Sequence, residues 1–221
     1  MSVAANLARI KNTLGAQPVT LVAVSKGVNI DLMVEAFENG VTEFGENRVQ
    51  DALEKQAALP PQMADKIHWH FIGHLQTNKV KKAVGRFALI HSVDSIRLAE
   101  EISREATAAG ITQAVLLQVK VVPDPSKSGF TPEQLRQSID QIMSLPNLQV
   151  EGLMTIAPFT ADEDIWQTCF DGLRDLRDEL ESASDDKYAL KELSMGMTQD
   201  WEAAVESGAT MIRLGRAVFG P

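Results

Sequence analysis

Two cations lie in strand-like segments at opposite ends of the sequence. Lys26 ends the run VTLVAVSK, and Arg213 lies within TMIRLG. Successive side chains of a strand point to opposite faces. The bulky Ile212 and Leu214 suit an outer face packed by helices, which leaves Arg213 pointing inward. A similar choice places Lys26 inward, at the carboxyl end of its strand.

A lysine in this position could act as a nucleophile. Burial and a neighbouring arginine both disfavour the ammonium form, and the neutral amine condenses with an aldehyde to give a Schiff base. If strands one and eight are neighbours, Lys26 and Arg213 meet at the carboxyl-terminal mouth of a barrel, where barrel active sites lie. The alternative is that Lys26 is a strand-end lysine that simply reaches water.

Two turns after strand-like segments could bind a phosphate, at residues 194–198 (SMGMT) and 214–220 (LGRAVFG). Barrels often bind phosphate after strands seven and eight, where small residues let backbone N–H groups approach the oxygens. Ser194 adds a hydroxyl and Arg216 a positive charge. A lysine nucleophile near a phosphate site indicates an aldehyde that carries a phosphate, although each glycine taken alone is typical of an ordinary turn.

Extended and helical segments alternate along the whole sequence, as expected for repeated β and α units around a parallel sheet. Eight strand-like runs span residues 19–26, 41–45, 67–73, 87–93, 114–122, 148–156, 190–196 and 210–215. Seven helical patterns span residues 31–39, 46–58, 76–84, 94–109, 131–144, 162–183 and 198–207. An amphipathic pattern at residues 3–14 precedes the first strand and supplies the eighth helix.

These elements predict an α/β fold with one domain over residues 1–221. The domain is a single (β/α)8 TIM-type barrel with an N-terminal helix before strand one. An open doubly wound sheet is the alternative. Eight evenly spaced units, with no G-x-G-x-x-G motif after the first strand, favour the closed barrel.

The composition excludes several classes of partner. The chain has 221 residues and a formal net charge of -9, which argues against nucleic acid or an anionic membrane as partner. The first residues lack the apolar core of a signal peptide, and no run approaches the roughly 20 apolar residues that span a bilayer. We expect a soluble cytoplasmic protein. Its single cysteine, Cys169, is expected in the core.

Three histidines lie close together in the sequence, at His68, His70 and His74. Their spacing covers one strand and a turn, and no carboxylate or thiolate accompanies them to complete a metal site. Structural roles are the simpler interpretation, so we predict no bound metal.

Eight ordered motifs resemble the pyridoxal phosphate homeostasis protein family, whose fold is similar to the barrel domain of bacterial alanine racemase. The motifs are LVAVSK (21–26), FGENRVQ (44–50), WHFIGHLQTNK (69–79), SVDS (92–95), SKSGF (126–130), GLMTIAP (152–158), LSMGMTQD (193–200) and IRLGRAVFG (212–220). The resemblance covers nearly the whole chain. It implies pyridoxal 5'-phosphate (PLP) as the cofactor.

The resemblance also assigns roles to residues. It implies that Lys26 carries PLP as an internal aldimine and that Arg213 faces the pyridine nitrogen. The phosphate is assigned to two groups, first Ser194 with Met195 and Gly196, and then the backbone amides of Gly215 and Arg216.

Three further residues are implied to lie near the cofactor, namely Asn47, His70 and Met154. Two positions depart from the family pattern. Arg216 stands where the family commonly has Thr or Ser, so a hydroxyl ligand is lost and a charge gained. Lys120 stands where Asn is usual, which puts a polar role for that position in doubt.

The same residues bear on catalysis. PLP enzymes usually pair an acidic side chain with the pyridine nitrogen, so that the protonated ring withdraws electrons. Arg213 would instead keep that nitrogen unprotonated. The racemases of this fold share that arrangement but take a catalytic tyrosine from an added domain. Here the sequence ends at Pro221, and its one tyrosine, Tyr188, precedes strand seven at the far end of the barrel.

We therefore expect no catalytic residue. The resemblance implies a monomeric carrier that stores or delivers PLP, that could supply apo-enzymes, and that serves PLP (vitamin B6) and amino-acid homeostasis. One alternative is a single-domain PLP-dependent amino-acid racemase with Lys26 and His70 as its two bases. Another is a cofactor-free aldolase that uses Lys26 on a phosphorylated sugar.

Overall fold

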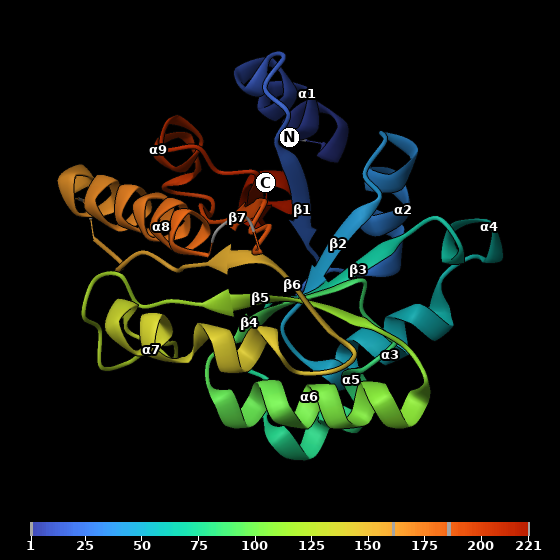
Figure 1. Ribbon diagram of the computed structural model, residues 1–221. Helices are drawn as coiled ribbons and strands as arrows, with labels where there is room; N and C mark the ends of the chain where they lie inside the picture. The colour runs from blue at the N-terminus through green and yellow to red at the C-terminus, as the bar shows by residue number, and fades with distance from the viewer. Residues whose placement is uncertain (1, 161, 185–186, 221) are drawn as a thin grey trace.

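Eight parallel strands close into a barrel in the order β1 to β8 in this computed structural model, which describes all residues except 1, 161, 185–186 and 221 (Figure 1). The strands are β1 (Thr20–Val24), β2 (Glu43–Glu46), β3 (His68–Phe71), β4 (Leu89–Val93), β5 (Gln113–Gln118), β6 (Leu148–Met154), β7 (Glu192–Ser194) and β8 (Met211–Leu214). The predicted closed (β/α)8 barrel is confirmed.

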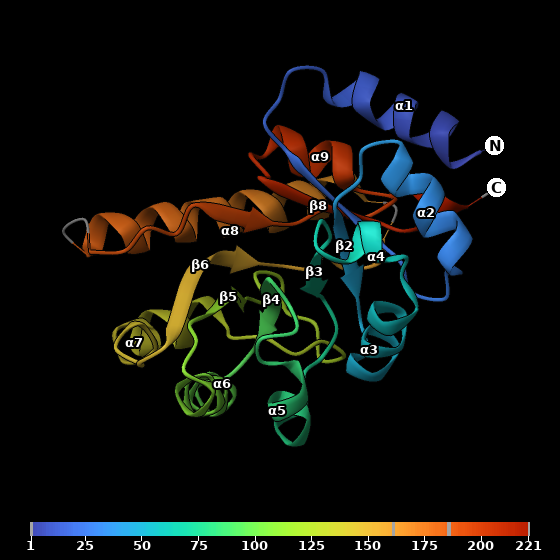
Figure 2. The ribbon, with the colours of Figure 1, turned by 90° about the vertical axis from the view of Figure 1, so that its right-hand side faces the viewer.

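Helices surround the barrel (Figures 1 and 2). They are α1 (Val3–Leu14), α2 (Ile30–Glu38), α3 (Val49–Ala58), α4 (Pro61–Ala64), α5 (Val80–Ala83), α6 (Ile96–Ala109), α7 (Pro132–Met143), α8 (Glu163–Ala183), α9 (Trp201–Glu206) and α10 (Arg216–Phe219), with a 3-10 turn, η1, at Thr77–Lys79. Every predicted helix is present. The short helices α4 and α10 were not predicted, because four residues are too few to show a helical period.

Local sequence signals explain several helix ends. Thr131 and Gln134 form a capping box at the start of α7, with a proline at its first position. The side chain of Ser95 caps α6 by accepting from the Leu98 amide at 3.3 Å. Gly110 ends the same helix in the left-handed conformation, with φ of 67°.

The N-terminal helix covers the seam where the barrel closes. Strand β1 pairs with β8, so that Val22 lies opposite Arg213. Helix α1 packs beside α10, and the Asn6 side chain donates to the carbonyl oxygens of Val218 at 3.0 Å and Gly220 at 3.1 Å. Figures 1 and 2 both show α1 next to the C-terminal segment. This confirms the helix predicted before strand one.

The core has two parts. The larger one lies between the strands and the helices and includes Cys169, which is buried as expected. The smaller one is a separate cluster of residues from four strands, Leu89, Leu116, Met154 and Met211. Because the neighbours of Met211 in β8, such as Ile212, belong to the larger cluster, this smaller cluster fills the inside of the barrel.

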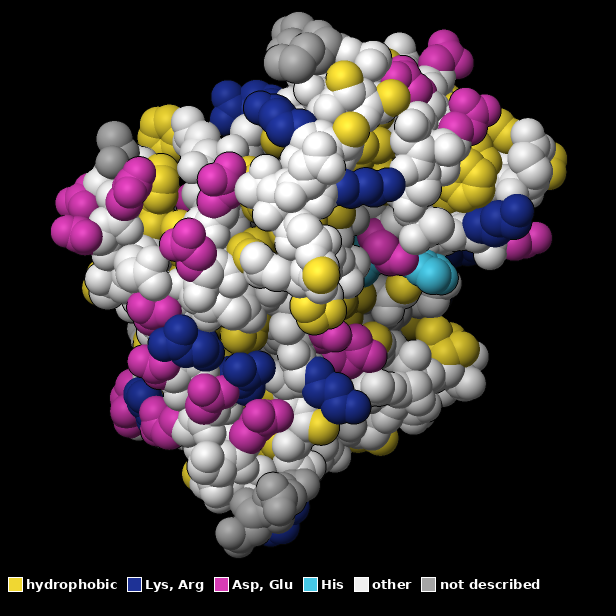
Figure 3. All heavy atoms as spheres, turned by 90° about the horizontal axis from the view of Figure 1, so that it is seen from above, with side chains coloured by type: hydrophobic (Ala, Val, Ile, Leu, Met, Phe, Trp, Pro, Cys, Tyr) yellow, Lys and Arg dark blue, Asp and Glu magenta, His cyan; other side chains and the backbone are white. Residues whose placement is uncertain are grey.

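No helix in the described ranges is long and apolar enough to cross a membrane. Basic and acidic side chains are intermingled over the face shown in Figure 3.

Candidate functional site

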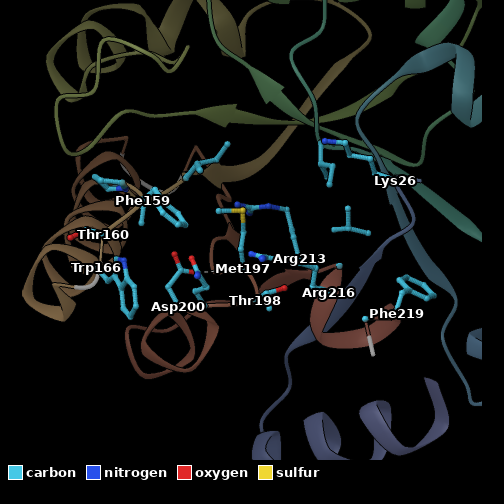
Figure 4. Close-up of a pocket in the computed structure, with 18 of the residues that line it drawn as sticks. Lys26, Phe159, Thr160, Trp166, Met197, Thr198, Asp200, Arg213, Arg216 and Phe219 are labelled. Carbon is cyan, nitrogen blue, oxygen red and sulfur yellow. Dashed lines mark hydrogen bonds between the residues drawn. The ribbon is translucent and has the colours of Figure 1, made fainter. Parts of the chain in front are cut away.

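A cavity of about 590 Å³ opens at the carboxyl-terminal mouth of the barrel. It is lined by Val24 of β1 and Lys26 in the turn after this strand, by Arg213 of β8, and by Gly215 and Arg216, which follow β8. Its size is in the range of small-molecule sites. Figure 4 shows Lys26 and Phe219 at one end of the cavity and Phe159, Thr160 and Trp166 at the other.

Lys26 lies in the turn after β1, with an exposed side chain beside the cavity. Val24 lines the same cavity, whereas Ser25 is buried on the opposite face and donates to Glu46 Oε1 at 2.7 Å. The strand alternation therefore places Lys26 on the cavity side. Its amine is accessible both to solvent and to a ligand in the cavity.

Arg213 reaches the centre of the cavity in Figure 4 and is only 3% exposed. Its guanidinium donates to Ser194 Oγ at 2.6 Å and to the carbonyl oxygen of Thr155 at 2.9 Å. Burial lowers the pKa of Arg213 to about 10, partly offset by the charge of Asp200. The side chain is thus a fixed cation at neutral pH.

The turn after β8 lines the cavity with Gly215 and Arg216. Gly215 precedes α10, and no side chain in the described part of the protein caps that helix at this residue. The amide of Ala217 reaches the Thr198 hydroxyl at 3.4 Å. Thr198, Gly215 and Arg216 all line the cavity. Amides at a helix start with a nearby hydroxyl and a cation can hold a phosphate.

The other predicted phosphate residues lie deeper. Ser194 is fully buried, its hydroxyl bound to His91 Nδ1 at 2.8 Å and to Arg213. Met195 is also buried, and Gly196 adopts φ of 89°, where a Cβ would come within 2.7 Å of Ala204 Cβ. Of the described residues, those that line the cavity do not include these three. Their contact with phosphate stays a prediction.

Thr198 is a residue that the sequence reasoning missed. The strand β7 ends at Ser194, whose side chain still faces the inside of the barrel, while Thr198 comes four residues later and lies beside the cavity. The signal was present, because both hydroxyls belong to the same motif, LSMGMTQD.

The remaining predicted cofactor residues lie outside the cavity. Met154 and His70 are buried within the barrel, at 0% and 3% exposure. Asn47 lines a smaller hollow of about 190 Å³, together with Arg48 and Lys79. Its Oδ1 is buried and has no hydrogen-bond partner among the described residues. The structure brings together Lys26, Arg213, Gly215 and Arg216, whereas Asn47, His70 and Met154 are not among the described lining residues.

A second missed residue is Asp200, which lines the cavity and is 6% exposed. Its Oδ1 accepts from the Met197 amide at 2.6 Å. Burial raises the pKa of this carboxyl, although the Met197 hydrogen bond and the charge of Arg213 act against the rise. This carboxylate holds the turn at 197–200 and adds a negative charge to the cavity wall.

The histidines have a carboxylate partner that the sequence reasoning did not find. Glu43 accepts from His68 at 2.7 Å and from His70 at 2.8 Å, because β2 and β3 pair with Glu43 opposite His68. Burial would raise the pKa of Glu43, but these hydrogen bonds lower it to about 2. Within the described ranges, no group of three or more His, Cys, Asp or Glu residues is placed to hold a metal ion.

Tyr188 contacts the outside of the barrel. Its hydroxyl donates to Asp140 on α7, and this contact and burial raise the pKa of Tyr188 to about 12. It is absent from the described lining of the cavity.

Comparison with known proteins identifies the family. The protein-family model described as alanine racemase, N-terminal domain, matches residues 1–221. Two relatives named pyridoxal phosphate homeostasis protein are similar to this chain: that of Aquifex aeolicus is 43% identical over 90% of this chain and 86% of its own, and that of Pseudomonas aeruginosa is 40% identical over 99% and 92%.

Solved structures agree with this. PipY of Synechococcus elongatus, solved with PLP bound, superposes with a TM-score of 0.91 at 41% identity, covering 99% of this chain and all of its own. Alanine racemase of Clostridium difficile has the same fold, with a TM-score of 0.81 at 17% identity over 98% of this chain and 56% of its own. The chain belongs to the pyridoxal phosphate homeostasis protein family.

Proposed function

We propose that this barrel is one PLP-binding domain that holds the cofactor on Lys26. The observation that carries the proposal is the placement of the Lys26 amine and the buried Arg213 cation around one cavity, next to the turn at Gly215. The amine would attack the cofactor's aldehyde, a C=N bond would replace C=O, and one water would leave. The same bond is broken by water on release.

The cavity fits the other parts of PLP. Thr198, Gly215 and Arg216 offer a hydroxyl, backbone amides and a charge for the phosphate. Arg213 would donate to the pyridine nitrogen from its anchored position. In the bound state PLP supplies an electron-withdrawing ring, and an arginine at its nitrogen weakens that property. The PLP named for PipY and the names of the curated relatives support this assignment.

We infer a carrier rather than a catalyst. His70, the second base that a racemase would need, is hydrogen-bonded through both ring nitrogens, to Glu43 and to His91, and is 3% exposed. Tyr188 is bound to Asp140. Because Lys26 is exposed, water could reach the bond and release the cofactor, and the released PLP could pass to apo-enzymes. We further propose that the protein acts in the cytoplasm, as a monomer, in PLP and amino-acid homeostasis.

Absorbance spectroscopy tests the binding site. Purified protein incubated with PLP should show a visible band that borohydride removes, and mass spectrometry should then locate the reduced adduct on Lys26. Lys26→Ala should lose the band, while Lys81→Ala, which removes an exposed lysine on α5, should keep it. Wild-type protein that takes up no PLP would falsify the proposal.

A second measurement separates carrier from racemase. The PLP-loaded protein should convert L-alanine to D-alanine no faster than free PLP does, and it should restore activity to an apo-PLP enzyme after mixing. Turnover at rates typical of enzymes, roughly 1 per second or faster, contradicts the carrier role.

A further inference from the structure

Five polar side chains, four of them buried, form a continuous row of hydrogen bonds through the inside of the barrel. Glu43 Oε2 lies 2.8 Å from His70 Nε2, and His70 Nδ1 lies 2.8 Å from His91 Nε2. His91 Nδ1 lies 2.8 Å from Ser194 Oγ, which accepts from Arg213 at 2.6 Å. The five residues come from five different strands, β2, β3, β4, β7 and β8.

This row of hydrogen bonds connects the two mouths of the barrel. Glu43 is the first residue of β2 and lies at the amino-terminal mouth, where its side chain is 21% exposed. Arg213 lines the cavity at the carboxyl-terminal mouth. The three residues between them, His70, His91 and Ser194, are all at least 97% buried. A charge at one mouth is therefore connected to a charge at the other through groups shielded from water.

The hydrogen bonds can run in only one direction without leaving a group unsatisfied. Arg213 can only donate, so Ser194 Oγ accepts from it and passes its own hydrogen to His91 Nδ1. His91 then donates from Nε2 to His70 Nδ1, and His70 donates from Nε2 to the Glu43 carboxylate. The reverse order would point a ring lone pair at that carboxylate and leave the Ser194 hydrogen without an acceptor among the described residues.

This order places the ring hydrogen on Nε2 in both imidazoles. Burial lowers the pKa of His91 well below its usual range, and the charge of Arg213 lowers it further. Bonds that point the same way polarise one another, so the negative charge of Glu43 makes Ser194 Oγ a better acceptor for Arg213. The negative charge of Glu43 thereby partly compensates the Arg213 cation, which is buried beside the cavity.

We propose that Glu43, His70, His91 and Ser194 are positioning residues that fix Arg213 and link its electrostatic potential in the cavity to the carboxylate at the opposite mouth. The proposal rests on the function proposed above for the cofactor. Other titratable groups interact with these five side chains. His68 contacts Glu43, and the carboxylates of Glu151 and Asp200 interact electrostatically with His70 and Arg213, respectively.

Glu43→Gln tests the link, because it removes a charge at the mouth remote from the cofactor while keeping an acceptor for His70. The matched control is Glu192→Gln, which removes a carboxylate from the first residue of β7. The Glu192 carboxylate accepts a hydrogen bond from Thr210 and contacts none of the five hydrogen-bonded side chains. Both variants are loaded with PLP, and the visible band is followed against pH.

We expect Glu43→Gln to lower the pH midpoint of the band by several tenths of a unit, since the Arg213 charge is then less compensated and disfavours a proton on the bound cofactor. Glu192→Gln should leave the midpoint within error of wild type. A Glu43→Gln protein that titrates like wild type overturns the proposal.

A measurement on wild-type protein without PLP keeps the proposal testable if Glu43→Gln fails to fold. Nitrogen NMR of histidine-labelled protein should show hydrogen on Nε2, and not on Nδ1, in both His70 and His91 at neutral pH. Hydrogen on Nδ1 of either ring overturns the proposal. Failure of wild-type protein to bind PLP leaves this spectrum unchanged and counts only against the proposed function.

Discussion

Lys55 donates to Glu46 Oε1 at 2.5 Å, directly behind the turn that carries Lys26. The Lys55 amine also donates to the carbonyl oxygen of Ser25, and the Ser25 hydroxyl donates to the same carboxylate oxygen at 2.7 Å. Glu46 is fully buried. Helix α3 is thereby tied to the ends of β1 and β2, and the backbone before Lys26 is held in place.

Replacement of Lys55 by Met should lower the free energy of unfolding by about 3–5 kcal/mol, because it leaves the buried carboxylate of Glu46 without its cation. Urea unfolding followed by circular dichroism measures the loss. The double variant Lys55→Met with Glu46→Gln should recover a large part of it. A loss below about 1 kcal/mol for the single variant means that the pair behaves as a surface salt bridge.

Thr198→Val should weaken PLP binding by about 3–10-fold, which corresponds to one hydrogen bond of roughly 1 kcal/mol. Spectroscopic titration with PLP gives the dissociation constant. Thr198→Ser keeps the hydroxyl and should bind like wild type. If Thr198→Val binds PLP as tightly as wild type, the hydroxyl that binds the phosphate is not that of Thr198, and Ser194 is the remaining predicted residue.

Glu43 should make stability depend on pH in the acid range. Its pKa is lowered from 4.5 to about 2 in the folded protein, so its contribution is fully present above about pH 4.5 and is lost as the pH falls toward 2. Because Glu43 is partly exposed, solvent screening reduces the size of the effect. Urea unfolding at about pH 5 and pH 3 should show a smaller loss for Glu43→Gln than for wild type; parallel losses contradict the assignment.

Gly196→Ala should destabilise the protein more than Gly110→Ala does. Both glycines have positive φ, at 89° and 67°, which costs an alanine about 1 kcal/mol or more. At Gly110 a Cβ meets nothing within 4 Å, whereas at Gly196 it comes within 2.7 Å of Ala204 Cβ. Thermal unfolding of the two variants separates strain from steric clash. Equal melting temperatures mean that the turn at Gly196 relaxes.

The fold could be predicted from the sequence because apolar periodicity reports directly which face of each element is buried. Lys26 and Arg213 could be placed at one mouth because parallel strands end at the same edge of a barrel. Ser194 could not be distinguished from Thr198, since this requires the last residue of β7, and a shift of one residue reverses the direction of a side chain.

The partners of the histidines depend on a different kind of information. Glu43 meets His68 and His70 through the register of β2 against β3, and Ser194 meets His91 across the inside of the barrel. Neither relation follows from spacing along the sequence. Asp200 was missed for a similar reason, because a carboxylate in a helix-start position is also typical of an ordinary cap.

The closing of the barrel by β1 and β8 has a consequence for how a newly made chain acquires its cofactor. Lys26 is synthesised long before Arg213 and the turn at Gly215. Contacts this far apart in sequence form slowly. PLP loading should therefore wait for Arg213 and Gly215 to join β1, with completion of the barrel as the event that creates affinity for the cofactor.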